Sequence, residues 1–202
     1  MSTRVPIVQV DAFTAEPFRG NPAAVCVLRA EADPAWMQAV AAEMNLSETA
    51  FVQRQGSGFG IRWFTPTTEV PLCGHATLSS AHVLWEDGLV APDEPIRFQS
   101  QSGPLGAHRE SDWICLDFPA RPVAEQAPPP GLADALGCPP VSVHYDQKET
   151  YLIELDTAER VRDLRPDIQR LHKLGFGSFI VTARGGPATA RCARGAGSSP
   201  TR

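Results

Sequence analysis

The sequence predicts a mixed α+β fold that is divided into two units. Short apolar segments rich in β-branched residues alternate with segments in which apolar residues recur at helical spacing, as in chains whose sheets are covered by helices. A proline-rich stretch at residues 119–130 interrupts this pattern and indicates a linker. The order of elements after the linker resembles the order at the start of the chain, which indicates a weak internal repeat. We therefore expect one unit at residues 1–118 and a second at residues 131–184.

Two helices and a series of strands are predicted in the first unit. The first helix begins at Pro34, because Asp33 is a good N-cap and proline is favoured at the first helical position. The second helix runs from about residue 74 to 86 with one apolar stripe, and Gly88 ends it. A loop is predicted at residues 65–72, directly before the second helix. Strands are expected at residues 5–13, 23–28, 49–53, 61–64, 96–100, 105–108 and 113–118.

The second unit is predicted to contain strands at residues 141–145, 151–155 and 178–183, with helical segments at 158–164 and 166–174. The amino-acid composition of the sequence changes after Arg184. Residues 185–202 contain no Val, Leu, Ile, Phe, Tyr or Trp, so they have nothing with which to form a core. We expect this tail to be disordered or translated out of frame.

Composition excludes several classes of function. The net charge of −5 argues against a general nucleic-acid binder, which normally carries a basic patch. No apolar run approaches the length of a membrane span, and the N-terminus has no signal-peptide pattern. The five cysteines are odd in number and lack C-x-x-C spacing, so we expect no disulfide framework, no metal site and a reducing cytoplasm. Four histidines show no metal-ligand spacing with one another and are interpreted as structural or surface residues: His82, His108, His144 and His172.

Glu48 is the first candidate catalytic residue. It stands where a helix ends and a strand begins, among Leu46, Ala50 and Phe51. Partial burial favours the neutral form of a carboxyl group, as a proton carrier at neutral pH requires. The plain alternative is a solvated glutamate at a helix end, which is the commoner situation for this residue type. Ser47, its neighbour, is a candidate substrate contact.

A second group of candidates opens the next helix. Gly74 would let a ligand approach the backbone, and the N–H groups that follow would stabilise a carboxylate or enolate oxygen beside His75. The position of Cys73 before a helix N-terminus would lower the pKa of its thiol and make it a thiolate base. The alternatives are a packing histidine and a small buried cysteine.

Three blocks of the sequence closely resemble the PhzF-like proteins, a family that comprises the phenazine-biosynthesis isomerase and its relatives. The blocks are DAFTAEPFRGNPAAV at residues 11–25, EMNLSETAF at 43–51 and FTPTTEVPLCGHATL at 64–78, in the family's order. The resemblance covers about residues 5–184 and is looser beyond the linker.

This resemblance implies a diaminopimelate-epimerase-like fold, with two pseudo-symmetric halves that each curve a mostly antiparallel sheet around a central helix. It implies acid–base catalysis without a cofactor in a cleft between the halves. By position Glu48 matches the family's general acid/base, and Gly74 and His75 match its substrate-contacting pair. Cys73 falls where epimerase relatives keep a catalytic cysteine, whereas the phenazine enzyme has a residue without a thiol there.

The sequence departs from the family beyond Arg184. The family's Asp-Phe-x-x-Arg-Phe-Phe block and its Glu-Asp-Pro-x-Thr-Gly loop, which opens the second central helix, are absent. Residues 187–194 resemble the translation of a shifted reading frame. The sequence therefore predicts a truncated or frameshifted member of the family with an incomplete second half.

Three functions follow from these observations. The first is a cofactor-independent isomerase that moves a proton on a small carboxylated metabolite. The second is a catalytically inactive remnant or binding protein. The third is an amino-acid epimerase or racemase that uses Cys73, but no second cysteine has a comparable setting to act as the other base. We expect a small carboxylate as substrate, no nucleic-acid or membrane partner, and a homodimer as the candidate assembly.

Overall fold

The computed structural model describes residues 4–16, 18–146, 150–175, 178–185 and 198–201. The chain divides into two compact units, of which the first comprises Met1–Pro119 with Cys192–Arg202 and the second Ala120–Arg191. Among the described helices, none combines the length and the apolar character needed to cross a membrane.

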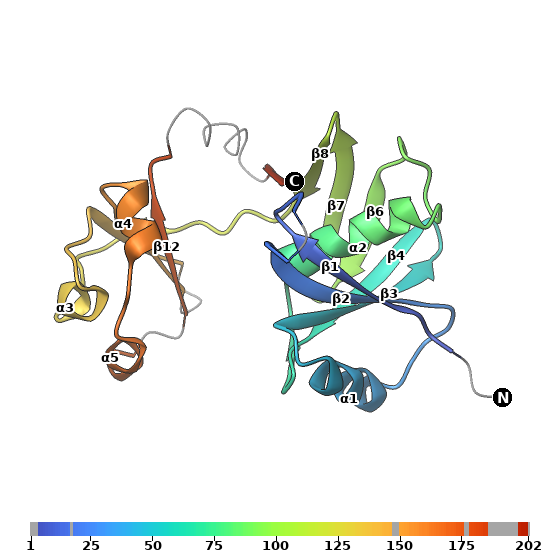
Figure 1. Ribbon diagram of the computed structural model, residues 1–202, viewed down its shortest axis with the longest axis horizontal. Helices are drawn as coiled ribbons and strands as arrows, with labels where there is room; N and C mark the ends of the chain where they lie inside the picture. Colours follow the sequence, from blue (N-terminus) through green and yellow to red (C-terminus); the bar gives the residue numbers. More distant parts are fainter. Residues whose placement is uncertain (1–3, 17, 147–149, 176–177, 186–197, 202) are drawn as a thin grey trace. The chain divides into compact units, whose positions relative to one another are not determined.

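The first unit is a curled sheet around one helix, α2 (Gly74–Glu86) (Figure 1). Neighbouring strands follow the order β1-β2-β3-β4-β6-β7-β8-β13, and β5 pairs with β4. Helix α2 packs against β1 and also against β8, which lie near opposite ends of this order, so the sheet must curve around the helix. The strands are β1 (Ile7–Ala12), β2 (Asn21–Leu28), β3 (Glu48–Gln55), β4 (Gly58–Phe64), β5 (Glu69–Val70), β6 (Ile96–Ser100), β7 (Gly103–Glu110), β8 (Trp113–Asp117) and β13 (Ser198–Thr201).

Helix α2 is buried on almost all sides, rather than along the single stripe that the sequence predicts. Small residues make this close enclosure by the sheet feasible. Its buried hydroxyl groups are satisfied within the helix: Thr77 Oγ1 donates to the Cys73 carbonyl, and Ser80 Oγ to the Ala76 carbonyl. The helix ends as predicted at Gly88, whose φ of 66° places it in the left-handed region that favours glycine.

Helix α1 (Pro34–Met44) packs on the other face of the sheet, against β3 and β4. Its predicted start is confirmed, because Asp33 Oδ1 accepts a hydrogen bond from the Ala35 N–H at 3.0 Å. Buried side chains between α1 and the sheet form a second cluster: Cys26, Leu28, Met37, Ala41, Phe51 and Phe64.

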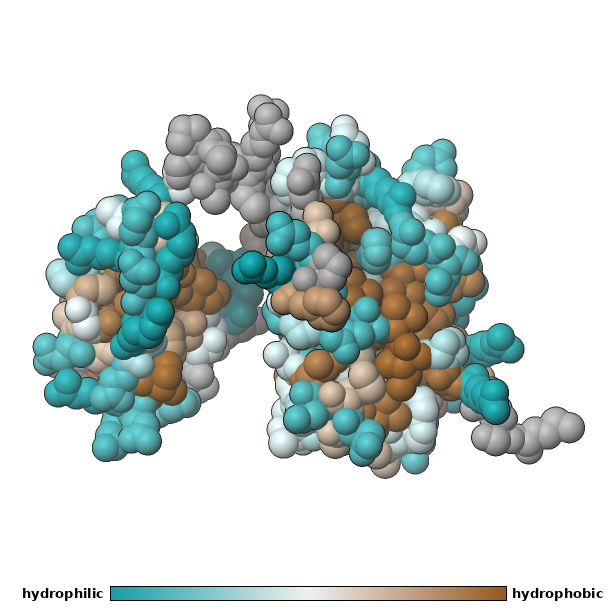
Figure 2. All heavy atoms as spheres, in the orientation of Figure 1, coloured by the Kyte–Doolittle hydropathy of each residue, from teal (hydrophilic) through white to brown (hydrophobic). Residues whose placement is uncertain are grey.

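The edge of this sheet at β1 carries exposed apolar side chains. Figure 2 shows hydrophobic residues (brown) at the surface of the first unit among hydrophilic ones (teal). Ile7 and Val8 of β1 are partly exposed, as is Phe13, which follows the strand. An exposed apolar edge of this kind is a site at which sheets associate.

The second unit is built on a smaller sheet with the strand order β12-β11-β10-β9, in which β11 and β12 run parallel. Its core contains buried side chains from both the sheet and the helices, including Leu132, Leu136, Ile153 and Leu171. The elements are β9 (Ala124–Glu125), α3 (Leu132–Leu136), β10 (Ser142–Tyr145), β11 (Thr150–Leu155), α4 (Ala158–Asp163), α5 (Ile168–Lys173) and β12 (Ser178–Ala183).

Several elements differ from the predictions. Strand β9 lies inside the predicted linker and pairs with β10, and β5 lies inside the predicted loop at residues 65–72. In the predicted disordered tail, residues 198–201 form strand β13, antiparallel to β8. This strand differs from the disorder expected there, and it is feasible because the outer edge of β8 offers backbone groups with which even an apolar-poor segment can pair. The prediction for residues 186–197 and 202 lies outside the described residues.

Candidate active site

Glu48 is the first residue of β3 rather than a loop residue before it. The chain leaves α1 at Asn45, whose left-handed conformation (φ 51°) turns it sharply toward the sheet. Strand β3 then runs parallel to β2, with Glu48 opposite Ala23. Because side chains alternate along a strand, this register fixes the face on which the carboxylate projects.

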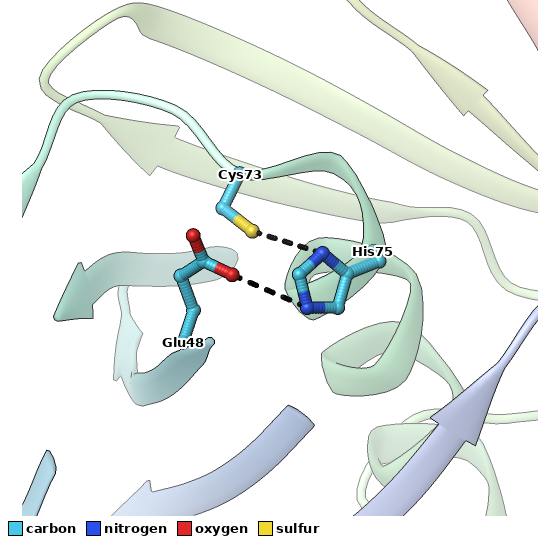
Figure 3. Close-up of side chains that lie close together, drawn as sticks. All are labelled: Glu48, Cys73 and His75. Carbon is cyan, nitrogen blue, oxygen red and sulfur yellow. Dashed lines mark hydrogen bonds and ion pairs between the residues drawn. The ribbon is translucent and has the colours of Figure 1, made fainter. Parts of the chain in front are cut away.

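The carboxylate of Glu48 lies against the imidazole of His75, in the first turn of α2 (Figure 3). Glu48 Oε2 and His75 Nε2 are 3.3 Å apart, and both side chains are largely removed from solvent. This is an electrostatic contact without hydrogen-bond geometry, since Nε2 is buried and has no hydrogen-bond partner among the described residues. A buried polar atom without a partner is rare in folded proteins and can be satisfied by a ligand.

Burial lowers the pKa of His75, because removal from water disfavours the imidazolium. The negative charge of Glu48 and the nearby Pro22 carbonyl act in the opposite direction but do not overcome this desolvation. The imidazole is therefore neutral at neutral pH, and it has one protonated and one unprotonated nitrogen.

Cys73 completes the cluster, with its Sγ 3.4 Å from His75 Nδ1 (Figure 3). The sequence predicts a lowered pKa for this thiol, and the structure shows the reverse. Burial raises the pKa of Cys73 to about 12, and the charge of Glu48 adds to this effect. The backbone N–H groups of Ala76 and His75 favour the thiolate, but the loss of water outweighs their influence. The cysteine is therefore a protonated thiol at neutral pH, which argues against its predicted use as a base.

Gly74 and Ser47, the two other predicted substrate contacts, are chain neighbours of the clustered residues. A Cβ atom built at Gly74 would meet only Phe118 Cε2, at 3.6 Å, so the protein backbone itself does not require glycine there. Ser47 is exposed immediately before Glu48, and its side chain makes no hydrogen bond with a described residue.

Arg62 of β4 makes a bidentate ion pair with Glu69, with N–O distances of 2.7 and 2.8 Å, and joins β4 to β5. Its guanidinium is thus already paired within the protein and not left for an anionic substrate. Hydrogen bonding to Glu69 raises the pKa of Arg62 above its ordinary value. Arg62 therefore has a structural role, as the positive partner of Glu69 between β4 and β5.

The cluster also has the composition of a cation site. One donor atom each from Glu48, Cys73 and His75 lies within 4.8 Å of the others. A cavity of about 410 Å³ lies further along α2, where Ser79 and His82 face Asp11 of β1 and Ile114 of β8. Its lining does not include the three clustered side chains, so we assign no substrate to it.

A curled sheet around a central helix, with a carboxylate and an imidazole at the helix N-terminus, defines a mixed α+β protein of the diaminopimelate-epimerase-like class. The chain belongs to the family of phenazine biosynthesis-like proteins, whose model matches residues 10–195. This match confirms the resemblance seen in the sequence and extends past Arg184, where we expected the likeness to end.

Individual relatives agree with this assignment. An uncharacterized isomerase from Halalkalibacterium halodurans is 49% identical over 180 residues, which are 89% of this chain and 68% of the relative. The human phenazine biosynthesis-like domain-containing protein is 50% identical over 131 residues, which are 61% of this chain and 45% of that protein. The chain thus spans between about half and two thirds of these relatives.

Solved structures confirm the fold. The crystal structure of a PhzF-family protein from Enterococcus faecalis has a TM-score of 0.82 and 41% sequence identity, and the match covers 91% of this chain and 70% of that one. A hydroxyproline epimerase from Agrobacterium vitis has a TM-score of 0.50 and 10% identity, over 78% of this chain and 53% of that one. At such low identity the second comparison supports the fold alone.

Proposed function

We propose that this chain carries the acid–base half of the active site of a cofactor-independent isomerase, which moves a proton on a small carboxylated metabolite. The contact between Glu48 Oε2 and His75 Nε2 at the N-terminus of α2 is the observation that carries this proposal. The names of relatives from Halalkalibacterium halodurans and Pseudomonas aeruginosa as isomerases support it.

In this mechanism Glu48 takes a proton from one carbon of the substrate and delivers it to another. The carboxylate becomes a carboxylic acid and is then restored, so no proton is gained or lost overall. Negative charge that develops on a substrate oxygen in between requires a nearby donor. The positive end of the α2 dipole and the unpartnered His75 Nε2 are suited to this task.

Cys73 has a positioning role in this mechanism. Because its thiol stays protonated, it can donate to His75 Nδ1, which places the ring proton on Nε2. Nε2–H then faces the carboxylate and the substrate oxygen. Cys73→Ala should therefore reduce turnover without abolishing it, whereas an epimerase that uses Cys73 as a base would lose all activity.

The test is solvent exchange in D₂O with a panel of small amino- and hydroxycarboxylic acids, followed by proton NMR. Wild-type chain should incorporate deuterium into one member of the panel, and Glu48→Gln should abolish this exchange. Glu43→Gln is the matched control, because Glu43 is an exposed glutamate of α1. Unaltered exchange in Glu48→Gln would contradict the proposed role.

A catalytically inactive binding protein is the second candidate. One observation favours it: in the described part of the second unit the longest helices, α4 and α5, have 6 residues each, so the second central helix that the resemblance implies for complete family members is not among them. Saturable binding of a carboxylate without any deuterium incorporation would support this candidate over the isomerase.

A further inference from the structure

The hairpin formed by β7 and β8 presents four metal-binding side chains on one face. His108 is the register partner of Cys115, and Asp117 is the partner of Gly106. Residues opposite each other in an antiparallel pair share a face, as do residues two apart on one strand. His108, Glu110, Cys115 and Asp117 therefore project from the same side of the hairpin.

Three of these side chains are close enough to share one cation. One donor atom each from His108, Glu110 and Cys115 lies within 4.8 Å of the others. Cys115 Sγ is 3.5 Å from Glu110 Oε2. Donors of a tetrahedral zinc ion, at about 2.0–2.3 Å from the metal, are roughly 3.3–3.8 Å apart. The donor atoms lie up to 4.8 Å apart at present. A rotation of the exposed Glu110 and the half-buried His108 side chains would bring them to the separations that a zinc ion requires.

Glu110 and Asp117 give this face negative charge. Among the described residues no lysine or arginine forms an ion pair with Glu110 or Asp117. Arg109, between His108 and Glu110, projects to the other face, where it pairs with Glu86. A divalent cation would supply the missing positive charge.

Asp117 is placed to orient the imidazole. Its Oδ2 lies 3.7 Å from His108 Nδ1. The glycine at position 106 leaves room for this arrangement, because a Cβ atom there would lie 3.3 Å from Asp117 Oδ2. Histidine ligands of metals commonly bond through their other nitrogen to such a carboxylate.

We propose that His108, Glu110 and Cys115 bind a transition-metal ion, with Asp117 as the carboxylate that orients His108. A thiolate, an imidazole and a carboxylate are each ligands that Zn²⁺ accepts. This site is built from none of the residues of the acid–base cluster, and it would clamp the two strands of the hairpin together. The sequence pattern did not reveal it, because His108 and Cys115 are brought together by strand register.

The test is a Co²⁺ titration of the full, untagged chain after treatment with a chelator, with thiolate-to-cobalt charge transfer in the near-ultraviolet as the readout. The acid–base cluster also contains a cysteine, so Cys73→Ala is the matched control for Cys115→Ala. The charge-transfer band should persist in Cys73→Ala and disappear in Cys115→Ala. A wild-type chain without the band, a band that survives Cys115→Ala, or a band lost in Cys73→Ala would each overturn the proposal.

Variants of the more exposed residues keep the test valid if Cys115→Ala fails to fold. Glu110→Gln should weaken Zn²⁺ binding by more than about 10-fold, and Asp117→Asn by roughly 10–100-fold, as for other outer partners of metal-bound histidine. Asp87→Asn, an exposed carboxylate after α2, is the control and should bind Zn²⁺ as wild type does. Unchanged Zn²⁺ affinity in Glu110→Gln would contradict the site.

Discussion

His75 Nε2 lies 3.3 Å from Glu48 Oε2, although the two residues belong to different elements of the first unit. Strand β3 and helix α2 both pack against β2, so this strand sets the position of the carboxylate relative to the imidazole. The neutral state of His75 and the partial burial of both groups make their contact sensitive to protonation.

Stability should fall as the pH is lowered through the ordinary titration range of histidine. The pKa of His75 is lowered in the folded protein from 6.5, so near and below that value the unfolded chain binds more protons than the folded one. The free energy of unfolding then decreases with decreasing pH. Well above pH 6.5 His75 is neutral in both states, so this destabilisation is absent. Urea unfolding between about pH 5 and pH 8 measures it. His75→Gln should show a weaker pH dependence, and equal slopes for both proteins would contradict this account.

The thiol of Cys73 should resist alkylation. With a pKa of about 12, its thiolate fraction at pH 8 is about 10⁻⁴, compared with about 0.1 for a thiol of pKa 9.0. Burial of the side chain slows the reaction further. Mass spectrometry of peptides after iodoacetamide treatment should find Cys73 unmodified in the folded chain and fully modified in denaturant, while the half-buried Cys138 reacts faster. Rapid modification of folded Cys73 would restore the thiolate-base hypothesis.

The ion pair between Arg62 and Glu69 should contribute to stability. Its geometry is bidentate and both side chains are partly buried, so a coupling energy of about 1 kcal/mol is expected, at the upper end for such pairs. A double-mutant cycle with Arg62→Met and Glu69→Gln measures it by chemical unfolding. The coupling should decrease at high salt. A coupling indistinguishable from zero would mean that solvent satisfies both groups equally well.

The sequence allowed good prediction of elements whose signals are local. Helix α1 begins at Pro34 because Asp33 caps it, and α2 ends before Gly88 because that residue adopts a positive φ. Elements without periodicity were not predicted. Strand β5 has two residues, and α3 has five between Gly131 and Gly137, so neither is long enough to show a pattern.

The candidate site was predictable as a set of residues but not in its electrostatics. The blocks around Glu48 and His75 pointed to the cluster that the structure brings together. The high pKa of Cys73 depends on burial by segments distant in the sequence, which no local pattern reveals. Likewise, the register that places His108 opposite Cys115 depends on a turn at Ser111, a residue with φ 56° where glycine would have given the stronger signal.

The buried hydroxyl groups of α2 bond only to carbonyls of the same helix, so they do not tie it to the surrounding sheet. Directional bonds near its far end come from Trp85 Nε1 to the Glu94 carbonyl and from Arg109 to Glu86. Among the described residues, the middle of the helix makes no side-chain hydrogen bond to the sheet, and packing of buried side chains holds it in place. The alignment of the His75 imidazole, to which we assign a catalytic role, then depends on core packing. Enlarging or shrinking a distant core residue such as Leu84 would change activity through rotation or sliding of the helix.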